Sequence, residues 1–271
     1  MAAHGGYAPG NEQAFNTESY DKIDEHDFRK VARAPMSTFS IDVDTASYSN
    51  VRRFLRTKQL PPIDAVRIEE LVNYFRYDDA PPTGDEPVAV NTELSAAPWK
   101  EGHQLLRIGI RAKDIAPAQV PARNLVFLLD VSGSMAMPDK LPLLKQAFGL
   151  LVDQLDEDDR VSIVVYAGAS GVVLELTPGN QKDKIMSAIR ELSPGGSTAG
   201  AQGIELAYHL AQQSFVKGGI NRVILATDGD FNVGVTSDGA LERLIENKRK
   251  SGVYLTVLGF GTGNLKDSKM E

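Results

Sequence analysis

The chain contains no cysteine among its 271 residues. This absence excludes disulfide bonds, thiolate metal sites and cysteine nucleophiles, although it does not decide the cellular compartment. The chain also lacks any apolar run of the roughly 18 residues that a transmembrane helix requires, and its first residues have neither the charged nor the apolar region of a signal peptide. We therefore expect no transmembrane segment in this chain.

An excess of basic residues is also missing, because 29 Lys and Arg stand against 36 Asp and Glu, a formal net charge of −7. Domains that bind nucleic acid usually carry a basic stripe, so we expect no nucleic-acid partner. The hydrophobic content of 42% is enough to fill a sizeable core. A chain of this length has room for one large domain and a smaller one.

Local composition divides the chain into three parts. Residues 1–19 are rich in Gly, Ala, Asn and Pro without apolar periodicity, which predicts a flexible lead-in. Residues 20–120 predict an accessory α+β unit. Its expected elements are a short strand, two helices and two longer strands, at 38–44, 48–55, 67–75, 88–96 and 104–112 in that order.

Residues 121–271 show apolar strands that alternate with amphipathic helices. We expect strands near 124–129, 161–166, 172–176, 222–226 and 253–260, and helices near 140–155, 181–192, 198–215 and 239–250. This alternation predicts βαβ units, hence an α/β fold with a doubly wound, mostly parallel sheet that is flanked by helices.

Polar side chains follow three strands of the predicted sheet. Asp130, Ser132 and Ser134 come directly after the apolar run 125–129, and their oxygens suit a hard cation such as Mg²⁺. Ligands of doubly wound sheets bind at the carboxyl ends of the strands. We therefore expect two further loops, with Thr198 and Asp228, to converge on the same place.

The pattern Asp130-x-Ser132-x-Ser134, together with Thr198 and Asp228, resembles the complete metal-ion-dependent adhesion site of von Willebrand factor type A domains. The likeness covers about 124–261. The segment 39–53 is similar to the N-terminal segment of a bacterial subgroup of these proteins. Members of that subgroup often look like exported or lipid-anchored envelope proteins, so the resemblance implies an extracytoplasmic or envelope location, with any leader absent from this chain.

The resemblance implies a non-enzymatic module that binds a protein partner through Mg²⁺, with Mn²⁺ or Ca²⁺ as alternatives. Ser132 and Ser134 would bind the metal directly, Asp130 directly or through water, and Thr198 and Asp228 according to conformation. An acidic side chain of the partner would take the open position. Ten residues follow Gly261, fewer than the terminal helix and sixth strand of the family need, so we expect a domain truncated at its C-terminal end.

Two other functions remain open on the sequence. A Mg²⁺-dependent hydrolase would need a general base near the metal, and Asp230 is the candidate. An adaptor would hand partners to an AAA-type ATPase complex. The sequence neither names nor excludes such a partner.

The pair Asp42 and Asp44 admits a second cation site or a phosphatase-like nucleophile. The phosphatase motif has a Thr where this chain has Ala46, so we favour capping of the following helix by these acids. The histidines His4, His26, His103 and His209 lack metal-ligand spacing.

Overall fold

The computed structural model describes residues 20, 22–23, 27–38, 40–116, 119–167, 169–195, 200–229 and 238–261. The chain divides into two compact units, one spanning Lys22–Val120 and one that contains Pro121 and the residues after it. Within the described ranges, no helix is both long enough and apolar enough to cross a membrane.

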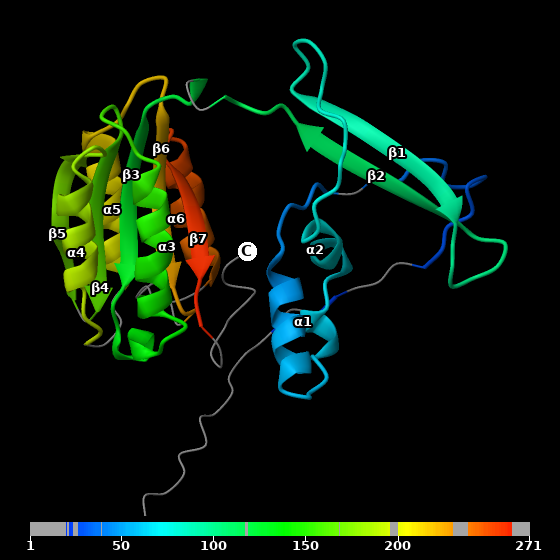
Figure 1. Ribbon diagram of the computed structural model, residues 1–271, viewed down its shortest axis with the longest axis horizontal. Coiled ribbons are helices and arrows are strands. Elements are labelled where there is room, and N and C mark those ends of the chain that lie inside the picture. Colours follow the sequence, from blue (N-terminus) through cyan, green and yellow to red (C-terminus); the bar gives the residue numbers. More distant parts are fainter. Residues whose placement is uncertain are drawn as a thin grey trace, which may run out of the picture. The chain divides into compact units, whose positions relative to one another are not determined.

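The larger unit is built on a five-stranded sheet in the order β5-β4-β3-β6-β7 (Figure 1). Neighbouring strands are parallel except for β5, which runs antiparallel to β4. Its register against β4 shifts twice, between Val161 and Ile163 and between Ile163 and Val164. The mostly parallel sheet is confirmed. The strands are β3 (Arg123–Asp130), β4 (Arg160–Ala167), β5 (Ala169–Pro178), β6 (Ile220–Thr227) and β7 (Tyr254–Gly259).

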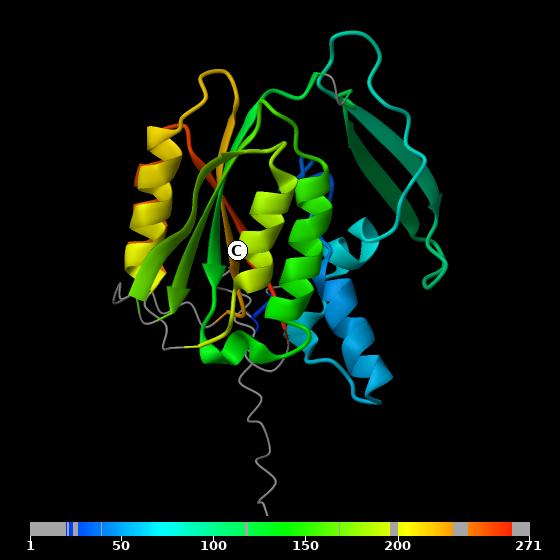
Figure 2. The same ribbon diagram turned by 60° about the vertical axis from the view of Figure 1, so that its left-hand side comes forward.

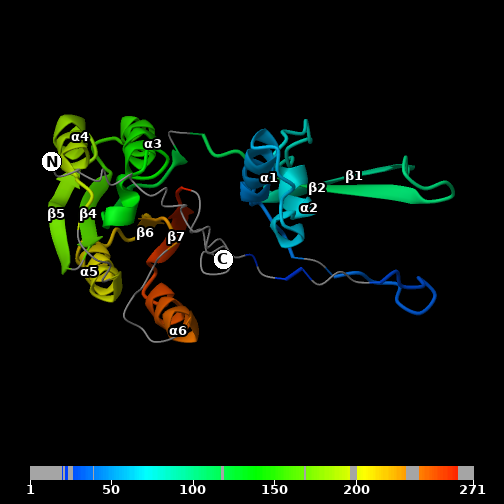
Figure 3. The same ribbon diagram turned by 90° about the horizontal axis from the view of Figure 1, so that it is seen from below.

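Helices cover both faces of this sheet. Figures 2 and 3 show α3 (Leu141–Asp153) and α4 (Lys182–Glu191) on one face, with α5 (Gly200–Gln213) and α6 (Asp238–Arg249) on the other. Successive residues of β3 serve the two faces in turn: Phe127 packs in the core beneath α3 and α4, and Leu128 in the core beneath α5. A strand that is buried on both faces reads as a continuous apolar run, which is why 125–129 was easy to predict.

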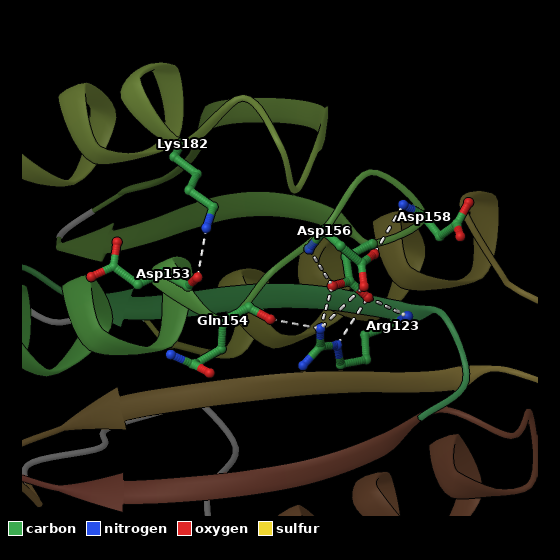
Figure 4. A network of polar contacts seen from close by, with 7 residues as sticks. Arg123, Asp153, Gln154, Asp156, Asp158 and Lys182 are labelled. Carbon is green, nitrogen blue, oxygen red and sulfur yellow. Dashed lines mark hydrogen bonds and ion pairs between the residues drawn. The ribbon is translucent and has the colours of Figure 1, made fainter. Parts of the chain in front are cut away.

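The amino end of β3 is held by a polar network (Figure 4). Arg123 donates from its backbone N and from Nε to Asp159 Oδ1, both at 2.9 Å, and from its guanidinium to the Gln154 carbonyl at 2.9 Å. Asp159 also accepts from the backbone N of Asp156. Burial alone would raise the pKa of Asp159, but the bonds from Arg123 and Asp156 outweigh it and lower that pKa.

A second buried group lies beside this network. The side chain of Asn124 donates to the Ala211 carbonyl of α5 at 2.9 Å and to Asn221 Oδ1 of β6 at 3.1 Å, and it accepts from Ser214 Oγ at 2.9 Å. The side chain of Asn124 therefore fixes the start of β3 to α5 and to β6. This leaves the carboxyl end of β3 as the place where loops can vary.

The smaller unit contains α1 (Ala46–Arg56), the short 3₁₀ helix η1 (Ile63–Ala65), α2 (Ile68–Asn73) and an antiparallel hairpin of β1 (Val88–Ala96) and β2 (Gln104–Ala112). The predicted bounds of both strands are confirmed. The predicted strand at 38–44 is wrong for the residues described there. Its backbone groups bond to side chains: Asp44 N donates to Asp42 Oδ1 at 2.8 Å, and Asn73 Nδ2 donates to the Asp42 carbonyl at 2.8 Å.

Helix α1 begins differently from the prediction that Asp42 and Asp44 cap it. The N-cap residue, Thr45, makes no side-chain hydrogen bond to the helix, and the first-turn amide of Ser47 donates to Glu70 Oε2 at 2.8 Å. The capping carboxylate thus comes from α2. Helix α2 is also shorter than predicted, and its buried residue is Glu70 while Ile68 and Val72 are exposed.

One face of the β1–β2 ribbon is apolar. Cross-strand pairs such as Val90 with Ile110 and Leu94 with Leu106 share that face, since their register makes them direct neighbours. We call this the apolar ribbon face. It comprises Val88, Val90, Leu94, Leu106, Ile108 and Ile110, all of them exposed in this structure.

Candidate metal centre

Asp130 is the last residue of β3, and its side chain is fully buried. Its Oδ1 accepts the backbone N–H of Ser132 at 2.8 Å, and its Oδ2 accepts from Thr227 Oγ1 of β6 at 3.2 Å. These two bonds fix the carboxylate between the ends of β3 and β6. Strands β4 and β5 lie on one side of β3, and β6 and β7 lie on the other. The strand order therefore reverses between β3 and β6, and doubly wound folds bind ligands at this point.

Ser132 and Ser134 lie in the turn that follows. The turn is a 3₁₀ helix, η3 (Gly133–Ala136), anchored by the fully buried side chain of Met135 in the core below α3. The two hydroxyl oxygens lie 3.0 Å apart. Ser132 is buried and Ser134 is exposed, so the pair spans from the interior to the surface.

Asp228 follows β6 directly and is also fully buried. Its Oδ2 accepts a hydrogen bond from Lys140 Nζ at 2.8 Å, which makes a buried ion pair. Beside it, the Gly229 amide donates to Thr227 Oγ1 at 3.3 Å. Carboxylates from two strands therefore face one region at the carboxyl edge of the sheet.

The electrostatics of the site disfavour a bare negative charge on Asp130. Burial raises the pKa of Asp130, the hydrogen bonds from Ser132 oppose that shift, and the charge of Asp228 adds to it. Burial also raises the pKa of Tyr166, its partner in the sheet register, and the charge of Asp130 raises it further. A cation bound here would stabilise both carboxylates.

Two predicted residues lie outside the described ranges, namely Thr198 and Asp230. The described flank of the Thr198 loop does reach the site, since Gly195 N donates to the Val131 carbonyl at 2.7 Å. On the other flank, α5 packs closely on the sheet: a Cβ at Gly203 would lie 3.1 Å from Leu128 Cδ1. Ligation of a metal by the five predicted residues stays a prediction.

The hydrogen-bonded hydroxyls of Ser132 and Ser134 have a separation that is compatible with two neighbouring ligands of an octahedral Mg²⁺. Neighbouring ligands about 2.1 Å from such an ion lie about 3.0 Å apart, which is the separation of the two serine hydroxyls. Where the structure is described, no group of three or more His, Cys, Asp or Glu could hold a metal ion. A centre on these residues would therefore depend on hydroxyl oxygens as well as carboxylates, a donor set that favours hard cations.

Sequence reasoning missed three residues at the site. Thr227 fixes Asp130, Tyr166 lies beside it, and Lys140 pairs with Asp228. Thr227 could have been found because it precedes Asp228 at a strand end. Lys140 gave no signal, since a lysine that follows Pro138 and Asp139 at the start of a predicted helix is usually solvated.

The other candidate residues lie elsewhere or are not described. Asp42 and Asp44 belong to the smaller unit and make the local contacts reported above. His103 and His209 are exposed, and His4 and His26 lie outside the described residues.

The sequence profile of the von Willebrand factor type A domain matches residues 124–271, and a second profile, described as von Willebrand factor, matches residues 14–107. The chain belongs to the von Willebrand factor type A domain family. The first match contains nearly all of the α/β unit and the candidate centre. The second covers most of the smaller unit, where the sequence resembled the N-terminal segment of a bacterial subgroup.

Curated relatives of this von Willebrand factor type A protein include YfbK of Escherichia coli (strain K12), which is 46% identical over 261 residues, covering 94% of this chain and 45% of the relative. The magnesium-chelatase 60 kDa subunit of Rhodobacter capsulatus is 28% identical over 184 residues, covering 64% of this chain and 32% of the relative. The chain thus spans less than half the length of these relatives.

Solved structures with a similar fold include a von Willebrand factor type A protein from Catenulispora acidiphila, at 20% identity and a TM-score of 0.49, covering 72% of this chain and 44% of that one. Another is proximal thread matrix protein 1 of the mussel byssus with a zinc-occupied MIDAS motif, at 27% identity and a TM-score of 0.44, covering 56% and 38%.

Proposed function

We propose that this chain is a metal-dependent protein-binding module, in which Mg²⁺ held by Asp130, Ser132, Ser134, Thr198 and Asp228 binds an acidic group of a partner. The observation that carries the proposal is the hydroxyl pair 3.0 Å apart beside two fully buried carboxylates. Ser134 is exposed, so a partner can approach the ion from that side. A carboxylate is the ligand that a hard cation with an open position favours.

We propose further that the module is not an enzyme. Asp130 and Asp228 are the carboxylates described at the centre, and in this proposal both bind the metal ion. A general base must instead be directed at the proton that it removes. The competing hydrolase would depend on Asp230. An envelope location belongs to the same proposal and rests on the family resemblance.

The metal claim is tested by titrating Mg²⁺ calorimetrically into the wild type and into Asp130→Asn, which keeps the shape of the side chain. We expect one Mg²⁺ per chain in the wild type and at least tenfold weaker binding in the variant, because a carboxylate is lost from the centre. Asp183→Ala, which removes an exposed carboxylate from α4, is the control and should bind as the wild type does. Equal affinity in all three proteins would refute the proposed centre.

The partner claim is tested by cross-linking capture from an envelope extract with Mg²⁺ or with EDTA. A partner that is retained only with Mg²⁺, and lost with Asp130→Asn, supports the module. Capture that is independent of metal contradicts it.

A second candidate is a role as one subunit of a larger enzyme assembly. The likeness to a magnesium-chelatase subunit favours it, and the partner would then be an ATPase of the AAA type. The same capture experiment separates the two, because it would return an ATPase.

A further inference from the structure

Lys140 is a buried lysine at the candidate metal centre. It lies between η3 and the first residue of α3, and the residue is 3% exposed. Its Nζ lies 2.8 Å from Asp228 Oδ2, and the side chains of both partners are almost fully buried. Lysine is rarely buried unless it is paired. The pair with Asp228 therefore accounts for its position.

The aliphatic part of Lys140 is enclosed by the backbone that leaves β7. Phe260 N donates to the Thr227 carbonyl at 2.9 Å, which holds this segment against β6. The next residue, Gly261, has φ of 87° and lies so close that a Cβ on it would be 2.5 Å from Lys140 Cγ. The ammonium group is thus directed at Asp228 by packing on its own stem, unlike a surface lysine that samples many rotamers.

This placement changes the charge of the centre. Asp130 and Asp228 carry two negative charges, and Lys140 brings the three groups to a net charge of −1. An ammonium group that donates to Asp228 Oδ2 occupies one of the two oxygens with which Asp228 could bind a metal ion. It also repels a divalent cation at short range in a buried region, where charges are poorly screened.

We propose that Lys140 is a built-in counter-ion that competes with the divalent cation for Asp228 and so weakens the affinity of the centre for metal. This inference rests on the metal site proposed above. In the metal-free protein Lys140 neutralises Asp228. In the metal-bound protein it keeps Asp228 from full coordination, so that Asp130 and the serine hydroxyls carry more of the binding.

The test compares Mg²⁺ affinity and thermal unfolding in the wild type, Lys140→Met and Lys140→Gln. The Gln variant removes the charge and offers an amide donor for Asp228 on a side chain one atom shorter. We expect both variants to bind Mg²⁺ at least tenfold more tightly than the wild type. We also expect a lower unfolding temperature without metal and a larger rise in that temperature with Mg²⁺, since at a given concentration a tighter ligand stabilises the folded state more.

Lys145→Met is the matched control on α3, because Lys145 donates to the carbonyls of Arg190 and Leu192. The affinity of this variant for Mg²⁺ should equal that of the wild type. A further variant, Gly261→Ala, pushes the Lys140 side chain aside without altering a charge, and it should also tighten Mg²⁺ binding. It keeps the test decisive if both Lys140 variants fail to fold.

The outcomes separate this inference from the proposed centre. If the wild type binds Mg²⁺ and the folded variants bind it with the same affinity or more weakly, the counter-ion role is wrong and the centre stands. If neither the wild type nor any variant binds Mg²⁺, the centre fails and the inference fails with it.

Discussion

Strand β3 and the β1–β2 ribbon are both rich in apolar residues, yet they bury them very differently. The residues of β3 from Val126 to Leu129 are fully buried between two helical layers. On the ribbon, Leu94 is 62% exposed and Leu106 is 55% exposed. The same residue types thus form a core in one unit and a surface in the other, because helices cover both faces of the larger sheet, whereas the described residues of the smaller unit leave the apolar ribbon face exposed.

The smaller unit depends on polar contacts where the larger one depends on packing. Among its described residues the buried hydrophobic ones are Phe54, Ala65 and Ala97. Its junction of α1, η1 and α2 is made by Ser47, whose Oγ donates to the Ala65 carbonyl at 2.7 Å and accepts from Arg67 N at 2.9 Å. An isolated two-stranded ribbon has little stability of its own. We therefore expect polar contacts to contribute a larger share of the stability in the smaller unit than in the larger one.

The largest expected difference comes from matched truncations of leucine. Leu144→Ala on α3 removes a fully buried side chain and should lower the free energy of unfolding by about 2–5 kcal/mol. Leu94→Ala on the apolar ribbon face should change it by about 0.5 kcal/mol or less. Urea denaturation followed by circular dichroism measures both. A large cost for Leu94→Ala would show that the apolar ribbon face is covered in solution and would break the comparison.

The ion pairs of the two units should also differ. Asp159→Asn breaks the Arg123 network and should cost about 2–4 kcal/mol at neutral pH, because the Asp159 side chain is 1% exposed. Asp79→Asn removes the two-pronged contact with Arg107, at 2.8 and 2.6 Å, on a partly exposed surface. Its effect should be smaller and should shrink further in high salt, because exposed pairs are screened.

The pH dependence of the Asp159 effect follows from the sign of its shift. Because the folded-state pKa of Asp159 is lowered, its contribution is fully present above the unfolded pKa of about 3.9 and is lost as pH falls through the folded value. The stabilities of wild type and Asp159→Asn should therefore begin to converge below about pH 4 and become equal once the pH is below the lowered folded-state pKa. A difference that persists in acid would mean that Asp159 acts through the hydrogen bonds that its two oxygens accept and not through its charge.

The smallest effects come from matched losses of a serine hydroxyl. Ser214→Ala in the larger unit leaves Asn124 without one buried hydrogen bond and should cost about 1 kcal/mol. Ser47→Ala removes two and should cost about 1–2 kcal/mol, felt as faster amide exchange in α1 and α2. Hydrogen–deuterium exchange with mass spectrometry resolves the two units. A Ser47 effect below that of Ser214 would argue against a polar junction.

Sequence periodicity was enough to predict most strands and helices. The bounds of β1 and β2 matched, and those of the α/β unit differed by few residues, because the alternation or run of apolar residues can be counted whether or not the apolar face is covered. The strand expected at 38–44 failed because a strand also needs a neighbour, which local sequence does not reveal. In the described structure its groups bond to side chains such as Asp42 and Asn73.

At the candidate centre, the sequence could identify the side chains that end strands but not the contacts between distant ones. Asp130, Ser132, Ser134 and Asp228 were predictable because parallel strands end at one edge of the sheet. The pairs formed by Lys140 with Asp228, and by Glu70 with the start of α1, join residues far apart in the chain. No local pattern encodes such a pair, because it depends on how the elements pack.

The irregular pairing of β4 and β5 affects whether β5 can pair with a strand of a second molecule. Strand β5 is at the edge of the sheet, and a straight edge offers a row of backbone donors and acceptors to any passing strand. The two register shifts along β4 and β5 bend the edge strand and disturb that row. We therefore expect a second chain to pair with β5 less readily than with a straight edge strand.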